Sequence, residues 1–435
     1  MDTPSHLLVA YLSLFGLRAF FQVFLHRLND AHLRRGGGQV PAVFEGWIDR
    51  ETLQKITSYT LDSSRFGLIA TLLSQGYFLF LLLSGLLPLL VREITPYVKG
   101  EIWSGLIFFG AFSLLLNLLQ IPLDLYDTFV IEARHGFNTR TWKVWFLDLF
   151  KTLTLSALLG GILLALLLAL MVHGGPLWWL WAWIAVGTLE LLILWLYPWI
   201  IAPWFNRFEP IADEDLAQRI QALLAQVGLK SKGIFRMDAS KRSRHTNAYF
   251  TGLGKSKRIV LFDTLLASHP PEEILAVLAH EIGHWKKGHL RKQLLLVEAA
   301  SLLGFFLTDR LLRWPDLYSA FGFSEPIGYV GLLLIGAIFS PLAFFLHPLV
   351  NTLSRRFERE ADDFAQNRLG SGEWLANSLR RIAKDNLADL NPHPLYAWFY
   401  ASHPTLAERI QRLTARPDSG QRQTPRPIFP GPRSE

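Results

Sequence analysis

Long apolar runs separated by shorter polar segments dominate the chain up to about residue 350. Five of the runs are each about as long as a helix needs to cross the hydrocarbon layer of a bilayer, roughly 20 residues. These five runs are Leu68–Val91, Ile102–Leu123, Thr152–Val172, Leu177–Ile201 and Ile327–Val350. Two weaker runs are Leu7–Leu25, interrupted by Arg18, and Leu294–Leu307, which carries Glu298. The pattern predicts an α-helical polytopic membrane protein with about seven transmembrane helices.

Basic residues are concentrated in alternate loops. The segment between the first two spans carries Arg27, Arg34, Arg35, Arg50, Lys55 and Arg65, and the segment between the third and fourth spans carries Arg134, Arg140, Lys143 and Lys151. Loops rich in Lys and Arg stay on the cytoplasmic side of a membrane. We therefore expect the N-terminus outside, the C-terminus in the cytoplasm, and the long segment from Asn206 to Lys292 facing the cytoplasm.

After the fifth span the pattern changes to that of a soluble α+β unit. An apolar helical stripe begins after a capping Asp213 and stops at Gly228, and strand-like runs follow at Gly233–Asp238, Asn247–Thr251 and Arg258–Phe262. A turn over residues 252–255 predicts that the last two runs form a hairpin. Amphipathic helices are expected again after residue 350, and the Pro-, Arg- and Ser-rich residues 416–435 are expected to be disordered.

Composition and charge restrict the possible functions. Hydrophobic residues make up 51% of the chain and charged residues 18%. The net charge of +7 is explained by the loop asymmetry and by contact with anionic lipid head groups, and no basic and aromatic interleaving indicates nucleic-acid binding. The chain has no cysteine, which excludes disulfides and thiol catalysis and leaves His and carboxylate as zinc ligands.

The segment His280-Glu281-Ile282-Gly283-His284 has the spacing of a zinc hydrolase. Residues four apart lie on one face of an α-helix, so His280 and His284 can present two imidazole nitrogens to one metal ion. Glu281 lies about 100° round the helix, where it can reach a metal-bound water. The expected helix begins at Pro270-Pro271, with acids in its first turn.

A third ligand is expected from the acidic run that follows the last span. Glu358 and Asp362 are four residues apart and share a helix face, whereas Glu360 points roughly the opposite way. The alternative is a solvated helix whose acids pair with neighbouring arginines. It weakens once the histidine pair requires a third ligand, because two His, one Glu and water form a standard open zinc site.

At this point the chain resembles the integral-membrane CAAX prenyl endopeptidases of type 1, which are zinc metalloproteases of the gluzincin kind. The resemblance covers nearly the whole chain and several motifs in the same order. These are Thr128-Phe129-Val130-Ile131-Glu132, His135-Gly136-Phe137-Asn138, Asn247-Ala248-Tyr249-Phe250, Arg258–Thr264, the His280–Trp285 run, Ser354–Glu358 with Ala361-Asp362, and Ser402-His403-Pro404 with Arg409.

The resemblance implies roles for named residues. His280, His284 and Glu358 would bind one zinc ion per chain, Glu281 would be the general base, and Asp362 would support His280. His403 and Arg409 would lie near the substrate carbonyl. An edge strand formed by Asn247, Ala248, Tyr249, Phe250 and Thr251 would hold the peptide extended. The run around Glu358 is more charged than the family pattern suggests, which leaves Glu360 as a weak rival ligand.

The resemblance also implies an architecture and a substrate class. Seven helices would surround a water-filled chamber, and the catalytic domain would close its cytoplasmic end. The family cleaves near a prenylated C-terminal cysteine and removes the last three residues. Quality control of membrane proteins is the other expected task, and we expect a monomer in a bacterial inner membrane.

These expectations divide the chain into five segments. They are 1–205 with transmembrane helices 1–5, 206–292 with the catalytic histidine pair, 293–350 with helices 6–7, 351–415 with the third ligand, and the tail 416–435.

Other functions are less consistent with the sequence, and the remaining ionisable residues suggest no further site. The histidine-bearing helix is too polar at both ends for a protease that cuts inside the membrane. A non-catalytic receptor or scaffold with a structural zinc, or a transporter, are alternatives, but structural zinc sites normally have four protein ligands. Glu190 and Glu298 lie inside predicted spans, and Arg18 is expected to snorkel or pair. The histidines expected to be ordinary surface or packing residues are His269, His289, His347 and His393.

Overall fold

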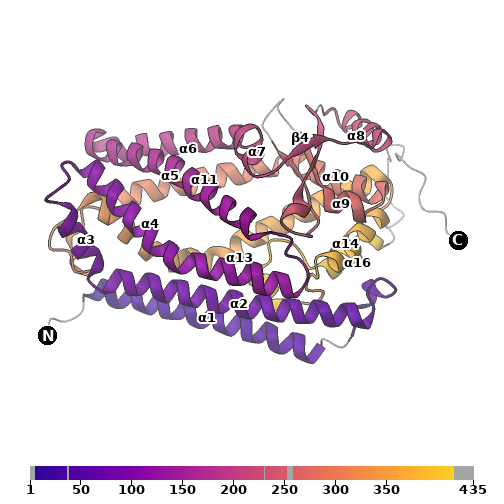
Figure 1. Ribbon diagram of the computed structural model, residues 1–435, viewed down its shortest axis with the longest axis horizontal. Helices are drawn as coiled ribbons and strands as arrows, with labels where there is room; N and C mark the ends of the chain where they lie inside the picture. The colour runs from indigo at the N-terminus through magenta and orange to yellow at the C-terminus, as the bar shows by residue number, and fades with distance from the viewer. Residues whose placement is uncertain (1–4, 37–38, 230, 252–257, 416–435) are drawn as a thin grey trace.

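A long bundle of helices ends in a smaller cap of helices and one sheet (Figure 1). The computed structural model describes residues 5–36, 39–229, 231–251 and 258–415. The expected turn at residues 252–255 and the expected disordered tail at 416–435 therefore lie outside the described residues.

The bundle is built from apolar helices that match the runs of the sequence. Its helices are α1 (His6–Gly36), α2 (Arg50–Leu83), α3 (Leu86–Ile94), α4 (Glu101–Tyr126), α5 (Trp142–His173), α6 (Trp178–Leu196), α7 (Ala202–Phe205), α11 (His289–Leu311), α12 (Pro315–Ser319) and α13 (Gly328–Leu369). Wider π-helical turns extend α4 over Asp127–Glu132 (η2) and α6 over Tyr197–Ile201 (η4). Among the described residues, six helices are long and apolar enough to cross a membrane, and α11 is the remaining predicted span. The fold is thus a multi-pass helical membrane region, as predicted.

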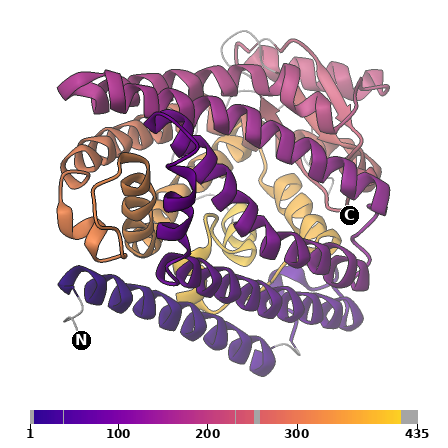
Figure 2. The same cartoon turned by 60° about the vertical axis from the view of Figure 1, so that its left-hand side comes forward.

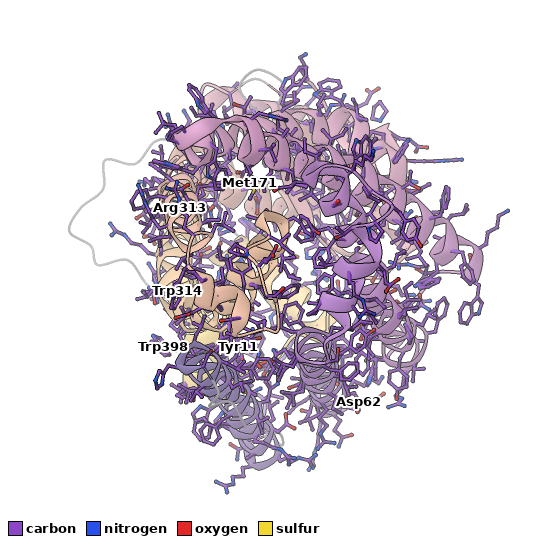
Figure 3. The ribbon with its side chains drawn as sticks, turned by 90° about the vertical axis from the view of Figure 1, so that its left-hand side faces the viewer. Tyr11, Asp62, Met171, Arg313, Trp314 and Trp398 are labelled. Carbon is purple, nitrogen blue, oxygen red and sulfur yellow. The ribbon has the colours of Figure 1, made fainter. Side chains whose placement is uncertain are left out.

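These helices are arranged as a ring. The helices α1 and α2 lie along one side and α5 and α6 along the opposite side, with α4, α11 and α13 between them (Figures 1 and 2). Figure 3 shows the end of the ring remote from α10 (Pro271–Lys286), where Tyr11, Met171 and Arg313 come from three different segments. The expected water-filled chamber stays a prediction.

The cap contains most of the segment expected to be an α+β unit and the helices after α13. Its elements are β1 (Phe208–Pro210), α8 (Glu214–Gln226), β2 (Ile234–Met237), β3 (Ala248–Thr251), β4 (Arg258–Phe262), α9 (Asp263–Ser268), α10 (Pro271–Lys286), α14 (Glu373–Asp385), α15 (Pro394–Tyr400) and α16 (Leu406–Thr414). Single 3₁₀ turns lie at Ala42–Phe44 and Ala239–Lys241, and a third, Gly175–Leu177, joins α5 to α6 in the bundle. The sheet has the order β1-β2-β4-β3. β3 and β4 pair antiparallel as predicted, β2 and β4 pair parallel, and β3 lies at an edge. The three-residue strand β1 was not predicted.

Two helices position the functional residues. α10 is the centre of the cap, where it packs against α8, α13, α14 and β3, and its apolar residues from Ile274 to Ile282 are buried except for Val277, which is partly buried. α13 has 42 residues, about 63 Å at 1.5 Å per residue. It therefore runs from the membrane region into the cap without interruption, and the boundary placed after residue 350 falls inside it. This one continuous helix carries Glu358 to α10.

Candidate metal centre

The histidine pair lies on the buried side of α10. The helix begins with Pro271, Glu272 and Glu273, which suit the first turn because proline needs no helical N–H partner there and acids favour the positive end of the helix dipole. His280 and His284 lie one turn apart, and their Nε2 atoms are 3.1 Å from each other. The predicted helix and the predicted common face are both present.

Glu358 of α13 completes a group of three possible metal ligands. Its Oε1 lies 3.2 Å from Nε2 of His284, and its Oε2 lies 3.4 Å from Nε2 of His280. Within the described chain, these three residues form a group whose ligand atoms all lie within 4.8 Å of one another. Tetrahedral ligands about 2.0–2.1 Å from a zinc ion would be about 3.3 Å apart, which agrees with the observed spacing.

The chemistry of Glu358 also fits a cation. The residue is 6% exposed, and its Oε2 is buried without a hydrogen bond from any described residue. Burial raises the pKa of this carboxyl, but the neighbouring His280 and His284 outweigh burial and lower it. A buried, ionised oxygen with no hydrogen bond from the described residues, facing two imidazole nitrogens, is the arrangement that a bound metal ion would satisfy.

Asp362 and Arg409 fix the orientation of the His280 ring from the side opposite the metal centre. Nδ1 of His280 lies 2.8 Å from Oδ1 of Asp362, so a proton on Nδ1 leaves Nε2 free to face the centre. Arg409 donates from Nε and Nη2 to the two oxygens of Asp362, at 3.0 and 2.7 Å. Burial would lower the pKa of His280, but hydrogen bonds with Asp362 and Glu358 raise it to about 9.

His403 and Arg409 differ in exposure. His403 lies in the loop between α15 and α16; its side chain is 60% exposed, and its Nε2 lies 3.3 Å from Oε1 of Glu358. Arg409 is only 7% exposed, and its Nη1 is 3.5 Å from Oε2 of Glu358. His403 is therefore on the solvent-accessible side of the centre. Arg409 is buried beside it, where it hydrogen-bonds Asp362.

Glu281 lies beside the two histidines, and no described residue donates a hydrogen bond to its carboxylate. Burial raises the pKa of Glu281, and His280 and His284 oppose this only in part. A buried carboxylate with a raised pKa and no hydrogen bond from the described residues is better able to take up a proton than an exposed one.

His289 is a neighbour of the centre that the sequence analysis missed. Its Nδ1 lies 3.0 Å from Nδ1 of His284, and its Nε2 lies 3.2 Å from Oε2 of Glu360. Glu360 also accepts from Arg356 at 3.1 Å. The rival ligand Glu360 therefore faces away from the histidine pair. Gly288, with φ of 67°, turns the chain between α10 and α11 and brings His289 back.

The expected substrate strand is β3 with the preceding Asn247. β3 packs against α10, and its outer edge is unpaired within the four-stranded sheet of the described residues. Asn247 accepts a hydrogen bond from Phe262 N through its main-chain oxygen, and its side chain accepts one from Ala248 N at 2.8 Å. The edge is thus fixed beside the helix that carries the histidine pair.

Comparisons with known proteins cover almost the whole chain. A family model described as "CAAX prenyl protease N-terminal, five membrane helices" matches residues 30–207, and one described as "Peptidase family M48" matches residues 210–417. The chain is 34% identical over 403 residues to CAAX prenyl protease 1 of Saccharomyces cerevisiae, covering 86% of this chain and 88% of that protein.

Two further relatives agree with this result. The chain is 34% identical over 385 residues to the CAAX prenyl protease 1 homolog of Arabidopsis thaliana, covering 86% of this chain and 90% of that protein. Its fold is similar to the crystal structure of S. mikatae Ste24p, with a TM-score of 0.87, 31% sequence identity, and coverage of 95% of this chain and 100% of that chain.

Proposed function

The chain belongs to the family of membrane-embedded M48 peptidases that includes the CAAX prenyl protease 1 homologues, and we propose that it cleaves peptides at a zinc ion held by His280, His284 and Glu358. It is a multi-pass membrane metalloendopeptidase. The observation that carries the proposal is the convergence of these three ligands from α10 and α13, whose ligand atoms lie within 4.8 Å of one another and include the buried Oε2 of Glu358, which has no hydrogen bond from the described residues.

The residues around the centre suit metal-assisted amide hydrolysis. When bound, a zinc ion supplies the Lewis acidity that makes a water molecule acidic enough to lose a proton near neutral pH. Glu281 takes that proton as the water attacks the scissile carbonyl, and then passes it to the leaving amine. His403, on the accessible side, donates to the developing oxyanion. Arg409 supports the same charge indirectly, because it holds Asp362 and lies near Glu358.

The substrate is proposed to bind as an added strand. An extended peptide along Asn247, Ala248, Tyr249, Phe250 and Thr251 would gain main-chain hydrogen bonds that depend little on its sequence. The names of the relatives support C-terminal CAAX processing of prenylated proteins, and quality control of membrane proteins is the second candidate.

The finer topology is also proposed. Segments 206–292 and 351–415 form the catalytic unit on the cytoplasmic side, and segments 1–205 and 293–350 lie in the membrane of a monomer with one zinc ion. The loop charges support an external N-terminus and a cytoplasmic C-terminus. The bacterial inner membrane stays a prediction.

Cleavage of a fluorogenic peptide by the detergent-purified protein tests the proposed function. Activity should disappear with a zinc chelator and return with added zinc. Glu281→Gln should retain zinc but lose roughly 10²-fold or more in rate, the size of a general-base contribution. Glu272→Gln is the matched control, because Glu272 is on the same helix but bonds Arg219 away from the centre. Equal activity of the Glu281→Gln and control variants would refute the mechanism.

A second comparison tests the substrate class. Peptides that end in Cys followed by three residues are supplied with and without an isoprenoid on the cysteine, and the products are identified by mass spectrometry. Release of the last three residues only from the modified peptide supports CAAX processing. Cleavage at several internal bonds of both peptides supports quality control instead.

A further inference from the structure

Two sequence motifs that the metal centre does not use lie together where the bundle meets the cap. The first, Thr128-Phe129-Val130-Ile131-Glu132, ends the π-helical turn η2, and the second, His135-Gly136-Phe137-Asn138, follows it in the segment that leads to α5. π-Helical turns are uncommon and are often found at functional sites. Neither motif supplies one of the three proposed metal ligands, so their role lies elsewhere.

The second motif pairs with the segment that enters the proposed substrate strand. Asn138 and Ser243 form an isolated antiparallel bridge. Beside this bridge, Arg244 N donates to the carbonyl oxygen of Phe137 at 3.2 Å. The bundle is therefore joined through the main chain to the residues just before Asn247–Thr251.

A side-chain contact joins the first motif to the same segment. Nε2 of His245 lies 3.4 Å from Oε2 of Glu132, and the other oxygen of this carboxylate accepts a hydrogen bond from the hydroxyl of Tyr59 on α2 at 2.6 Å. The His245 ring also stacks on the ring of Phe137, with centroids 4.1 Å apart and planes at 17°. Both motifs therefore contact the residue that lies two positions before Asn247.

The cap holds His245 from its other side. Oδ1 of Asn386, the residue after α14, accepts from Thr246 N at 3.0 Å and lies 3.3 Å from Nδ1 of His245. Because this oxygen is an acceptor, Nδ1 of His245 donates to it. The carbonyl oxygen of His245 accepts from Oγ1 of Thr264 at 2.9 Å. His245 is thus fixed between the bundle and the cap, with its second ring nitrogen facing Glu132.

The position of β3 depends on the segment that precedes it. β3 has four residues and, within the described sheet, pairs on one side only, with β4. An added peptide strand gains hydrogen bonds only where the N–H and C=O groups of its partner are held in line with its own. The side chains of Glu132 and His245 are 22% and 35% exposed, so their contact is partly shielded from water and contributes more than a surface pair.

We propose that Glu132 is a positioning residue for peptide binding, which acts through His245 to hold the outer edge of Asn247–Thr251 in place. This inference rests on the proposed function and its substrate strand, and it adds the membrane region to the peptide-binding machinery. Within the described residues, none of the hydrogen bonds, ion pairs or ring contacts of Glu132 and His245 reaches a proposed metal ligand. The contact should therefore change how tightly a peptide binds and leave zinc binding unchanged.

Cleavage of a fluorogenic peptide by the full-length protein in detergent, over a range of peptide concentrations, tests the proposal. Glu132→Leu should raise KM by about tenfold, the effect of losing one hydrogen bond to a charged group. Both kcat and zinc affinity should stay unchanged, because hydrogen bonds along the strand form equally in the bound peptide and in the transition state. His245→Phe keeps the ring stack on Phe137 and should raise KM at least as much. The double variant should have the KM of His245→Phe alone, since the two residues act through one contact.

The matched control is Asp124→Leu on α4. Asp124 is a carboxylate near the same end of the helix, and it accepts a hydrogen bond from Nε1 of Trp145 at 2.7 Å. Among the described residues its hydrogen bonds do not reach residues 242–247. Asp124→Leu should therefore keep the KM of the wild type.

Peptides with one methylated backbone amide separate positioning from a general loss of structure. Methylation removes one main-chain donor, so at an amide that pairs with the strand it should raise the wild-type KM by about tenfold. The same methylation should raise the KM of Glu132→Leu by less than about threefold, because that hydrogen bond is already weakened. An equal methylation effect in the two proteins would overturn the proposal, and so would a set of methylated peptides that all keep the wild-type KM.

Failure of this inference can be told apart from failure of the proposed function. A wild-type protein that cleaves no peptide with zinc refutes the proposed function. An active protein whose KM is the same in Glu132→Leu, His245→Phe and Asp124→Leu overturns only the positioning role, as does a fall in zinc affinity in Glu132→Leu. If Glu132→Leu does not fold, His245→Phe alone decides. Fluorescence anisotropy of a labelled peptide bound to Glu281→Gln measures binding without cleavage, and adding Glu132→Leu to that protein should weaken binding by about tenfold.

Discussion

Gly283 lies where the helix with the histidine pair crosses the helix with Glu358, and it offers a sharp test of the metal centre. A Cβ atom added at Gly283 would lie 3.0 Å from Cα and 3.1 Å from the carbonyl oxygen of Ala361, and 3.2 Å from Cβ of Phe364. Ordinary contacts of a Cβ atom begin at 3.4 Å. Because the first two neighbours are backbone atoms, Gly283→Ala must move α10 and α13 apart by 3.4 − 3.0, or about 0.4 Å.

This displacement is large for a metal site. Ala361 lies between Glu358 and Asp362 on α13, so both carboxylates move with it. Metal–ligand distances are expected to stay within about 0.2 Å of their usual values. We therefore expect Gly283→Ala to weaken zinc binding by about ten- to a hundredfold, or about 1.4–2.7 kcal/mol.

The effect on folding should be smaller than the effect on zinc binding. Overpacking lowers the unfolding free energy by about 1–3 kcal/mol. Replacing a helical glycine by alanine raises it by about 1 kcal/mol, because alanine has the higher helix propensity. The net loss of unfolding free energy is then about 0–2 kcal/mol. A variant that folds but binds zinc weakly is the expected outcome.

Competition between the protein and a fluorescent zinc chelator measures the affinity, and thermal unfolding with and without zinc measures the stability. The control is Gly336→Ala on α13, where an added Cβ has no atom within 4 Å. It should keep the zinc affinity of the wild type. If Gly283→Ala binds zinc as tightly as Gly336→Ala, the close crossing of α10 and α13 does not position the ligands.

Three further predictions concern residues around the centre and in the cap. Asp362→Asn removes the carboxylate that accepts two hydrogen bonds from the buried Arg409, so the unfolding free energy should fall by about 3–5 kcal/mol and zinc affinity by about ten- to a hundredfold. Denaturant unfolding and chelator competition measure the two quantities, and wild-type values would show that Asp362 does not orient His280. His289→Phe keeps an aromatic ring but removes the contact with Nδ1 of His284, so zinc affinity should fall about tenfold and zinc should dissociate faster. A zinc dissociation rate equal to that of the wild type would contradict this role of His289. Burial lowers the pKa of His269 to about 4 from 6.5, so its contribution to stability is complete above pH 6.5 and is lost as the pH falls toward 4. Between pH 7 and pH 5 the unfolding free energy of the wild-type protein should fall by about 2 kcal/mol more than that of His269→Gln, as measured by chemical denaturation at each pH. Equal decreases in the two proteins would show that another group is responsible.

Local spacing was enough to predict the elements that carry the site. The i, i+4 spacing of His280 and His284 depends only on helix geometry, which is why the common face was predicted from the sequence. Apolar length predicted the membrane spans for the same reason, since a bilayer sets how long a spanning helix must be. The hairpin of β3 and β4 was also predicted, because its two strands are close in the chain.

Contacts between distant segments were decided by the tertiary structure. Helix periodicity alone placed Glu358 and Glu360 on opposite faces, but only the packing of α13 on α10 turns Glu358 toward the histidines and Glu360 toward His289. The contact of His289 with His284 follows from the turn at Gly288, whose direction no side-chain spacing reveals.

Arg18 shows the same limit inside the membrane. Its position within an apolar run indicated that it snorkels or pairs, but the sequence does not say which helices surround it. The packing of four helices made its neighbours Ser340 and Phe344 rather than a carboxylate. Spacing along one helix is determined by backbone geometry, whereas the partner of a side chain depends on where other helices lie, and that is set by the packing of the whole chain.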